Sequence, residues 1–230
     1  MGRFTDMYGG YVMYGIGMTW FAIWTLVTGF SCSFPMLVVC RAMQGLGLSA
    51  YLPAGMTLLG KAYQPGPRKN LVFGIYGALS PIGFISGTTL GALSQELLSW
   101  SWYFYSGSII ATLCLIGVAI FAPRDWEEAR RSKVEMDWLG LVTTVPGFML
   151  LVYAITDSSR APKGWASPQI IGMLIGGIVF LGAAAYVEGW RAKAPLIPSD
   201  IFHVKYMKRM LLCLFVTWGI FSVFVFNANF

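Results

Sequence analysis

The sequence predicts an all-α, polytopic membrane protein with seven transmembrane helices. Of its 230 residues, 57% are hydrophobic and only 11% are charged, whereas a water-soluble protein carries about 25% charged residues. So few charges could not cover the surface of a soluble domain, and the mean hydropathy of +0.65 agrees with a surface that faces lipid. Membrane-crossing strands need strict alternation of apolar and polar residues. The chain lacks that pattern, so helices are expected.

Seven apolar runs have about the 20-residue length that a membrane-crossing helix needs. We expect each of them to form one helix, in chain order. The runs are 11–30, 36–59, 71–93, 102–122, 138–155, 170–187 and 210–226.

The positive residues predict a cytoplasmic N-terminus, because the cytoplasmic loops of membrane proteins are enriched in Lys and Arg. In this orientation the inner segments hold thirteen of the sixteen Lys and Arg residues, and the outer loops hold only Arg160 and Lys163. The plasma membrane and the vacuolar membrane both fit this distribution. The net charge is +6, but the positive residues are divided among separate inner segments and do not form one basic stripe. We therefore expect the lipid bilayer as the partner, and we expect no binding to nucleic acid.

The acidic residues argue against an enzyme. All ten Asp and Glu residues lie in loops or at the ends of the apolar runs. The runs contain no carboxylate pair, no Ser/His/Asp set and no metal-binding cluster. His203, the one histidine, lies in a basic loop and is interpreted as solvated. We therefore expect no catalytic residues, no cofactor and no metal.

Arg41 is a charged residue within an apolar run. An arginine near the centre of a membrane helix costs about 2.5–3.5 kcal/mol, so one that persists usually faces a cavity or a polar partner. Gln44 follows three residues later and shares its helix face. This pair favours a wet cavity that Arg41 and Gln44 line. The alternative is that the Arg41 side chain extends to the outer headgroups.

The third run carries a glycine at every fourth position, at Gly83, Gly87 and Gly91. This spacing clears one helix face, so that another backbone can approach closely. Pro81 removes a backbone hydrogen bond and is expected to bend the helix. A packing face beside a bend is what a sliding or rocking helix pair needs, and a static packing face is the alternative.

Four segments resemble motifs of the major facilitator superfamily, and they occur in the family's order. Residues 2–10 resemble the loop between helices 2 and 3, G-x-L-A-D-x-x-G-R-K, and residues 41–47 resemble the R-x-x-Q-G-x-G signature of helix 4. Residues 83–92 resemble the antiporter motif of helix 5. Residues 99–104 are similar to the W-R-W-x-F start of helix 6.

Two further segments, 137–140 and 194–198, resemble those around the two extra helices of fourteen-helix drug:proton antiporters. Within that family the chain is most similar to the fungal aminotriazole-resistance and boron-efflux type. The resemblance implies a multidrug-type efflux transporter that moves small-molecule substrates across the membrane in exchange for protons.

The resemblance also implies roles for individual residues. Gly2, Asp6 and Gly9 would belong to an inner gate loop. Arg41 and Gln44 would serve substrate binding or proton coupling. A kink and a helix-packing face would be formed by Pro81, Gly83, Gly87 and Gly91.

The sequence departs from the family motifs at three places. Gly10 and Tyr11 replace the basic pair of the loop, which weakens a charge-based latch. Thr88 and Ala92 replace the proline and the last glycine of the helix 5 motif, and this weakens the inference of antiport from that motif. Ser101 replaces the arginine at the start of helix 6.

The resemblance assigns the seven runs to family helices 3 to 9. Residues 1–123 would be part of the N-terminal half, 124–137 a cytoplasmic loop, 138–190 two inserted helices, and 191–230 a loop with the first helix of the C-terminal half. Because such transporters bind substrate between two six-helix halves, we expect an incomplete chain that does not transport alone.

Two other classes are considered. The chain could be a non-transporting fragment that associates with a full-length paralogue through its glycine faces, in a structural or regulatory role. A seven-helix receptor fits the number of runs but needs an outer N-terminus, which the distribution of Lys and Arg opposes.

Overall fold

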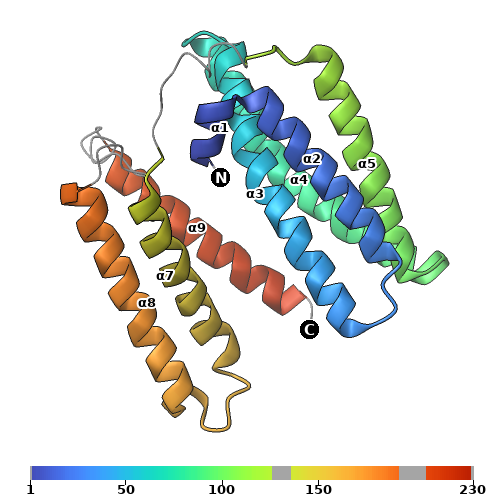
Figure 1. Cartoon of the computed structure of the whole chain (residues 1–230). Helices are drawn as coiled ribbons and strands as arrows, with labels where there is room; N and C mark the ends of the chain where they lie inside the picture. The colour runs from blue at the N-terminus through green and yellow to red at the C-terminus, as the bar shows by residue number, and fades with distance from the viewer. Residues whose placement is uncertain (1, 126–135, 192–205, 229–230) are drawn as a thin grey trace. The chain divides into compact units, whose positions relative to one another are not determined.

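The computed structural model describes residues 2–125, 136–191 and 206–228 (Figure 1). These residues form helices with short connections and contain no β-strand, so the all-α prediction is confirmed for them. The helices are α1 (Gly2–Tyr8), α2 (Gly10–Gly29), α3 (Phe34–Ala62), α4 (Pro67–Leu97), α5 (Trp100–Phe121), α7 (Trp138–Asp157), the 3₁₀ turn η1 (Gly164–Ala166), α8 (Pro168–Tyr186), the π-helical η2 (Val187–Arg191) and α9 (Met207–Ala228).

Every predicted apolar run coincides with one long helix, and among the described residues five helical segments are long and apolar enough to cross a membrane. These are α2, α4, α5, α7 and Pro168–Trp190. α3, which carries Arg41, Gln44 and Lys61, is not among the five. Seven crossings, and their assignment to family helices 3 to 9, stay predictions.

The chain divides into two compact units, residues 1–135 and 136–230, and each is described by itself. The finer division into a partial half, two inserted helices and two cytoplasmic loops stays a prediction. Large parts of both predicted loops, residues 126–135 and 192–205, lie outside the described residues.

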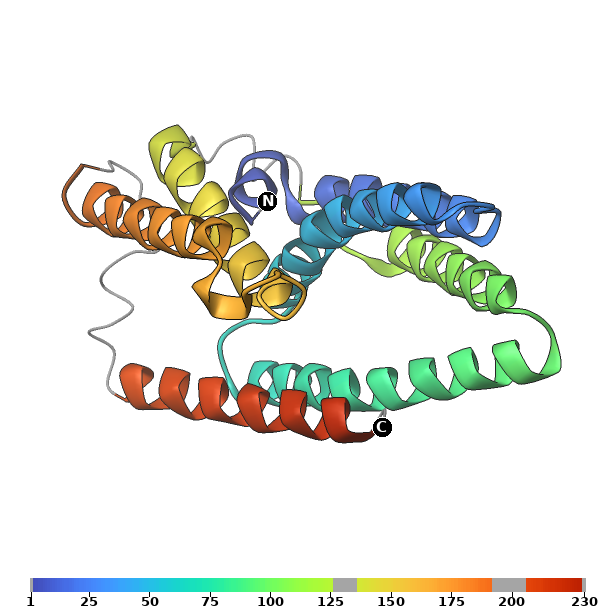
Figure 2. The same cartoon turned by 90° about the horizontal axis from the view of Figure 1, so that it is seen from below.

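The first unit is built around α2, which packs against both α3 and α5 (Figures 1 and 2). Met18 and Ala22 of α2 and Ala111 of α5 form its buried apolar cluster. The Ser108 hydroxyl of α5 donates a hydrogen bond of 2.9 Å to the Ala22 carbonyl oxygen. α4 packs mainly against α5.

Two glycines let α2 and α3 approach closely. A Cβ atom added to Gly17 would lie 2.8 Å from the Tyr51 backbone nitrogen, and one added to Gly47 would lie 2.9 Å from the Gly17 carbonyl oxygen. Real Cβ atoms do not come so close to backbone atoms, so any side chain at either position would push the helices apart. This is the small-residue packing that membrane helices use, at glycines other than those predicted to form a packing face.

The second unit contains a hairpin of α7 and α8, which pack together (Figure 1). Asp137 caps α7, because its Oδ1 accepts a hydrogen bond of 2.9 Å from the Gly140 N–H. The close approach between the two helices is at Gly177, whose added Cβ would lie 3.1 Å from the Gly147 carbonyl oxygen.

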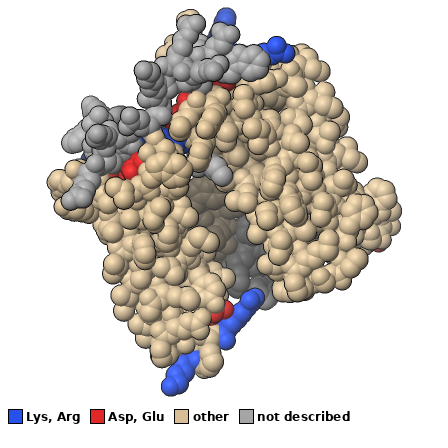
Figure 3. Space-filling view, viewed as in Figure 1, with Lys and Arg blue, Asp and Glu red and all other residues tan. Residues whose placement is uncertain are grey.

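On the face that Figure 3 shows, uncharged residues cover most of the described surface. Many of them are large and apolar, such as Phe34, which is 77% exposed, and Phe121, which is 85% exposed. A soluble protein rarely exposes so much contiguous apolar surface, whereas lipid tails are a suitable environment for it.

Candidate functional site

A cavity of about 380 Å³ lies in the first unit and is lined by α2, α3, α4 and α5. Its size is within the range of small-molecule binding sites. Arg41 and Gln44 of α3 line this cavity, and so do Gly83 and Gly87 of α4. The structure therefore brings together in one cavity four residues that the sequence singled out for two different roles.

Gln44 joins Arg41 to α2. The Arg41 Nη1 donates to the Gln44 Oε1 at 3.2 Å, and the Gln44 Nε2 donates to the Thr28 Oγ1 at 2.9 Å and to the Trp24 carbonyl oxygen at 3.4 Å. A carbonyl oxygen can only accept, so the amide nitrogen must face α2, which leaves the amide oxygen for Arg41. Gln44 is only 4% exposed and Thr28 is fully buried, so this polar chain is held inside the helix interface.

Phe104 of α5 holds the guanidinium from another side. The Arg41 Cζ lies 5.2 Å from the centre of the Phe104 ring, which is the geometry of a cation–π contact. Both Phe104 and Arg41 line the cavity. The Arg41 side chain is therefore positioned by contacts from α3 and α5 at the cavity wall.

The glycine face of α4 lies beside this cavity. A Cβ atom on Gly83 or Gly87 would meet no atom of the described chain within 4 Å, and one on Gly91 would lie 3.5 Å from the Tyr103 ring. Pro81 lies inside α4, which continues through it to Leu97. The absence of side chains at Gly83 and Gly87 leaves space in the cavity, and their role in packing or bending stays a prediction.

The predicted inner gate loop is a short helix rather than a loop. Gly2 and Asp6 lie in α1, which packs on α2 and α3. Such a short helix is not stable by itself, so tertiary packing, including the buried Thr5, explains why local sequence did not predict it. Gly9 separates α1 from α2 with φ 94°, a conformation that favours glycine.

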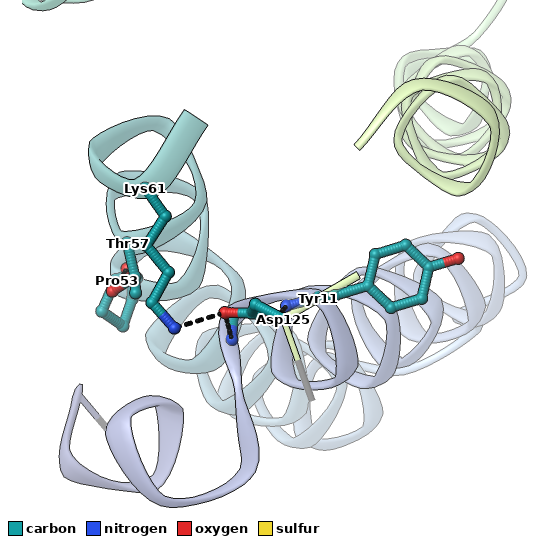
Figure 4. Close-up of polar contacts among 6 residues, drawn as sticks. Tyr11, Pro53, Thr57, Lys61 and Asp125 are labelled. Atoms are coloured by element: carbon teal, nitrogen blue, oxygen red, sulfur yellow. Dashed lines mark hydrogen bonds and ion pairs between the residues drawn. The ribbon is translucent and has the colours of Figure 1, made fainter. Parts of the chain in front are cut away.

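Asp125 forms a polar cluster that the sequence did not predict (Figure 4). Its Oδ2 accepts hydrogen bonds from the Gly10 N–H at 2.9 Å and from the Lys61 Nζ at 2.8 Å, and its Oδ1 accepts from the Tyr11 N–H at 2.9 Å. The carboxylate therefore caps the first turn of α2 and pairs with the last turn of α3.

The cluster holds the carboxyl group of Asp125 in its charged form. Burial of the side chain raises its pKa, but the hydrogen bonds from Lys61, Tyr11 and Gly10 together outweigh this effect and leave the pKa below its usual value. The N-terminal end of a helix also favours a negative charge.

Local patterns could not have found the three missed partners, Asp125, Thr28 and Phe104. Asp125 caps a helix that begins 115 residues earlier in the chain, whereas sequence rules for helix caps look only at adjacent residues. Thr28 stands in an apolar run, and Phe104 ends the motif at residues 99–104, which does not indicate a contact with Arg41. Only the packing of α2, α3 and α5 brings them to Gln44 and Arg41.

Comparison with known proteins gives the same family that the motifs resemble. The family model of the Major Facilitator Superfamily matches residues 1–230. The chain is 35% identical to "Efflux pump terJ" of Aspergillus terreus over 98% of this chain and 44% of the relative. It is 33% identical to the "Low affinity ammonium transporter" and 34% identical to the "Aminotriazole resistance protein", both of Saccharomyces cerevisiae, over 98% of this chain.

The matches cover 44% of the ammonium transporter and 42% of the aminotriazole resistance protein. The chain thus spans less than half the length of these relatives.

Proposed function

The chain belongs to the Major Facilitator Superfamily, and from this premise we propose that it serves the export of small molecules across a membrane in exchange for protons. The family consists of transporters and not enzymes, and similar proteins include an efflux pump and a drug-resistance protein. The observation that carries the proposal is the cavity in which Gln44 and Phe104 hold the Arg41 guanidinium. A family of transporters also disfavours the receptor alternative.

Arg41 is proposed to contact the substrate, and Gln44 to position Arg41 at the substrate cavity. Gln44 donates its amide hydrogens to α2, and its oxygen orients Arg41 toward the cavity. A guanidinium has five N–H donors in a fixed plane, and one of them is used by Gln44. Donors that remain on Arg41 can bind substrate atoms that accept hydrogen bonds.

Arg41 is proposed to support proton coupling as a fixed charge, not as the proton carrier. A guanidinium does not lose its proton in a protein. It does lower the pKa of a carboxyl group that comes within about 4–6 Å, so its approach to or withdrawal from an acidic group would move a proton. Efflux that persists after a protonophore collapses the pH gradient would contradict proton coupling.

Accumulation of a toxic solute tests the role of Arg41. In cells that express a full-length transporter containing these residues, we expect Arg41→Ala to abolish the decrease in solute accumulation, because the cavity then has no fixed charge. Arg160→Ala is the matched control, since Arg160 lies in the other unit, between α7 and η1. If the Arg41→Ala variant exports the solute as well as the unaltered protein does, at equal surface expression, the proposed role of Arg41 is refuted.

We also propose that transport needs more than these 230 residues. The support is that the chain spans 42–44% of the relatives named above and that transporters of this type bind substrate between two halves. Proteoliposomes that contain only this chain should show little or no substrate flux. Robust flux in them would overturn this proposal, and binding of the chain to a full-length paralogue would favour the structural role instead.

The orientation and the gate are part of the same proposal. We place the N-terminus in the cytoplasm of cells whose plasma or vacuolar membrane holds the protein, with Gly2, Asp6 and Gly9 near the inner gate. The support is the large excess of Lys and Arg in the inner segments. An epitope tag at Met1 should be inaccessible to antibody until the membrane is permeabilised.

A further inference from the structure

The cavity carries one fixed charge, and this charge has no carboxylate partner in the described chain. Arg41 is the one charged side chain among the lining residues. An ion pair of the first unit lies elsewhere, between Lys61 and Asp125. The Arg41 guanidinium interacts only with neutral groups of the described residues, the Gln44 amide and the Phe104 ring. Its positive charge is therefore not neutralised by this part of the chain.

The Arg41 guanidinium also has contacts from two helices, α3 and α5. Gln44 accepts a hydrogen bond from one N–H and is itself hydrogen-bonded to Thr28 and Trp24, while the Arg41 Cζ lies 5.2 Å from the centre of the Phe104 ring. A planar guanidinium held in this way binds a carboxylate through two parallel hydrogen bonds, which are stronger than hydrogen bonds between neutral groups.

The rest of the cavity wall is mainly apolar. Phe21, Leu90 and Ile110 line it together with Phe104, and Gly83 and Gly87 leave room where side chains would stand. Burying an apolar or aromatic body against these side chains stabilises a bound molecule by about 25 cal/mol for each Å² removed from water. The wall thus fits a molecule with one polar end and one compact apolar end.

We propose that this cavity selects amphipathic monoanions, with a carboxylate or similar anionic group on Arg41 and a compact aromatic or apolar body against Phe104 and Ile110. This inference rests on the proposed function, because it names the class of substrate for the same cavity. An anion gains charge-assisted hydrogen bonds from Arg41, an uncharged analogue gains weaker ones, and a cation is repelled.

Three molecules of nearly the same shape test the charge preference: benzoate, benzamide and benzamidine, which carry a negative, zero and positive charge at neutral pH. Their binding is measured by isothermal titration calorimetry on the full 230-residue chain in nanodiscs of phosphatidylcholine. We expect benzoate to bind roughly tenfold or more tightly than benzamide, and benzamidine to bind weakest.

Substitutions at Arg41 assign the preference to this residue. Arg41→Gln should remove the advantage of benzoate over benzamide, and Arg41→Lys should keep part of it, because a lysine retains the charge but not the planar fork. Arg160→Gln, which removes a positive charge from the other unit, should leave all three affinities unchanged. Circular dichroism of each variant checks the helix content. If Arg41→Gln fails to fold, the order of the three probes on the unaltered chain decides.

The failure of this inference differs from the failure of the proposed function. Equal binding of all three probes would overturn the anion preference while the cavity remains a binding site. Tighter binding of benzamidine would also overturn it. Loss of benzoate binding when phosphatidylglycerol is added to the nanodiscs would assign the anionic site to a lipid headgroup and would overturn it as well. Binding of none of the probes, together with unaltered export by Arg41→Ala, would contradict both proposals.

Discussion

Lys61 and Asp125 form an ion pair of 2.8 Å, Nζ to Oδ2, between the last turn of α3 and the segment that follows α5. The Asp125 side chain is 4% exposed, whereas that of Lys61 is 36% exposed. The same carboxylate accepts the N–H groups of Gly10 and Tyr11 at the start of α2. One buried side chain therefore links the ends of three helices of the first unit, α2, α3 and α5.

Asp125→Asn should destabilise the first unit, because the amide keeps the shape of the carboxylate but loses its charge and one acceptor. We expect the free energy of unfolding to fall by about 1–3 kcal/mol, as for hydrogen bonds to a buried charged group. Thermal unfolding in detergent, followed by circular dichroism, measures this. Lys61→Gln is the matched comparison and should cost about 1 kcal/mol or less, because Lys61 is partly solvated. Equal losses for both variants would contradict the dominant role of the backbone contacts.

The stability that Asp125 contributes should depend on pH. Its pKa in the folded chain lies below the usual value of 3.8, so the folded state binds fewer protons than the unfolded state near that pH. The contribution is therefore complete above about pH 5 and is lost as the pH falls through about 4 and below. Over this interval the melting temperature of the parent chain should fall more steeply than that of Asp125→Asn. Parallel curves would show that other carboxyl groups account for the acid sensitivity.

The helices were largely predictable from sequence, because the length of an apolar run reports the thickness of the bilayer directly. The run 138–155 became α7, Trp138–Asp157, with only its end extended. α1 was missed because its seven residues carry no apolar period and depend on packing against α2 and α3. α3 was predicted to cross the membrane but is not among the five apolar segments. The residues that line the cavity and the lysine that pairs with Asp125 make this helix less apolar.

The candidate site was predictable only in part. Arg41 and Gln44 stood out because polar residues in an apolar run are costly, and a spacing of three residues places them on one helix face. Glycine spacing, by contrast, shows that a face is open but not what lies against it. The glycines of α4 border a cavity, whereas Gly17 and Gly47, which the sequence did not mark as packing residues, lie where α2 and α3 approach closely.

Gly17→Ala should destabilise the contact between α2 and α3. The added methyl group would lie 2.8 Å from the Tyr51 nitrogen and 3.0 Å from the Gly47 carbonyl oxygen, and backbone atoms cannot move away cheaply. Overpacking of this kind costs typically 1–3 kcal/mol. Gly15→Ala in the same helix is the control, since its Cβ would meet nothing within 4 Å, and it should be neutral or stabilising by about 0.5–1 kcal/mol. Denaturant unfolding of both variants compares them, and a neutral Gly17→Ala would refute the close contact.

Thr28→Val should weaken the support of Arg41 without changing the cavity wall itself. The Thr28 Oγ1 accepts a hydrogen bond of 2.9 Å from the buried Gln44 amide, and valine has the same shape but no acceptor. The unpaired amide should cost about 1–3 kcal/mol of unfolding free energy. Thr19→Val is the matched control in α2, because the exposed Thr19 hydroxyl bonds only to the Gly15 carbonyl oxygen of its own helix, and it should change stability by about 0.5 kcal/mol or less. Two results together would contradict this role: Thr28→Val as stable as Thr19→Val, and unchanged export. They would show that the hydrogen bonds between Thr28 and Gln44 and between Gln44 and Arg41 do not position the guanidinium.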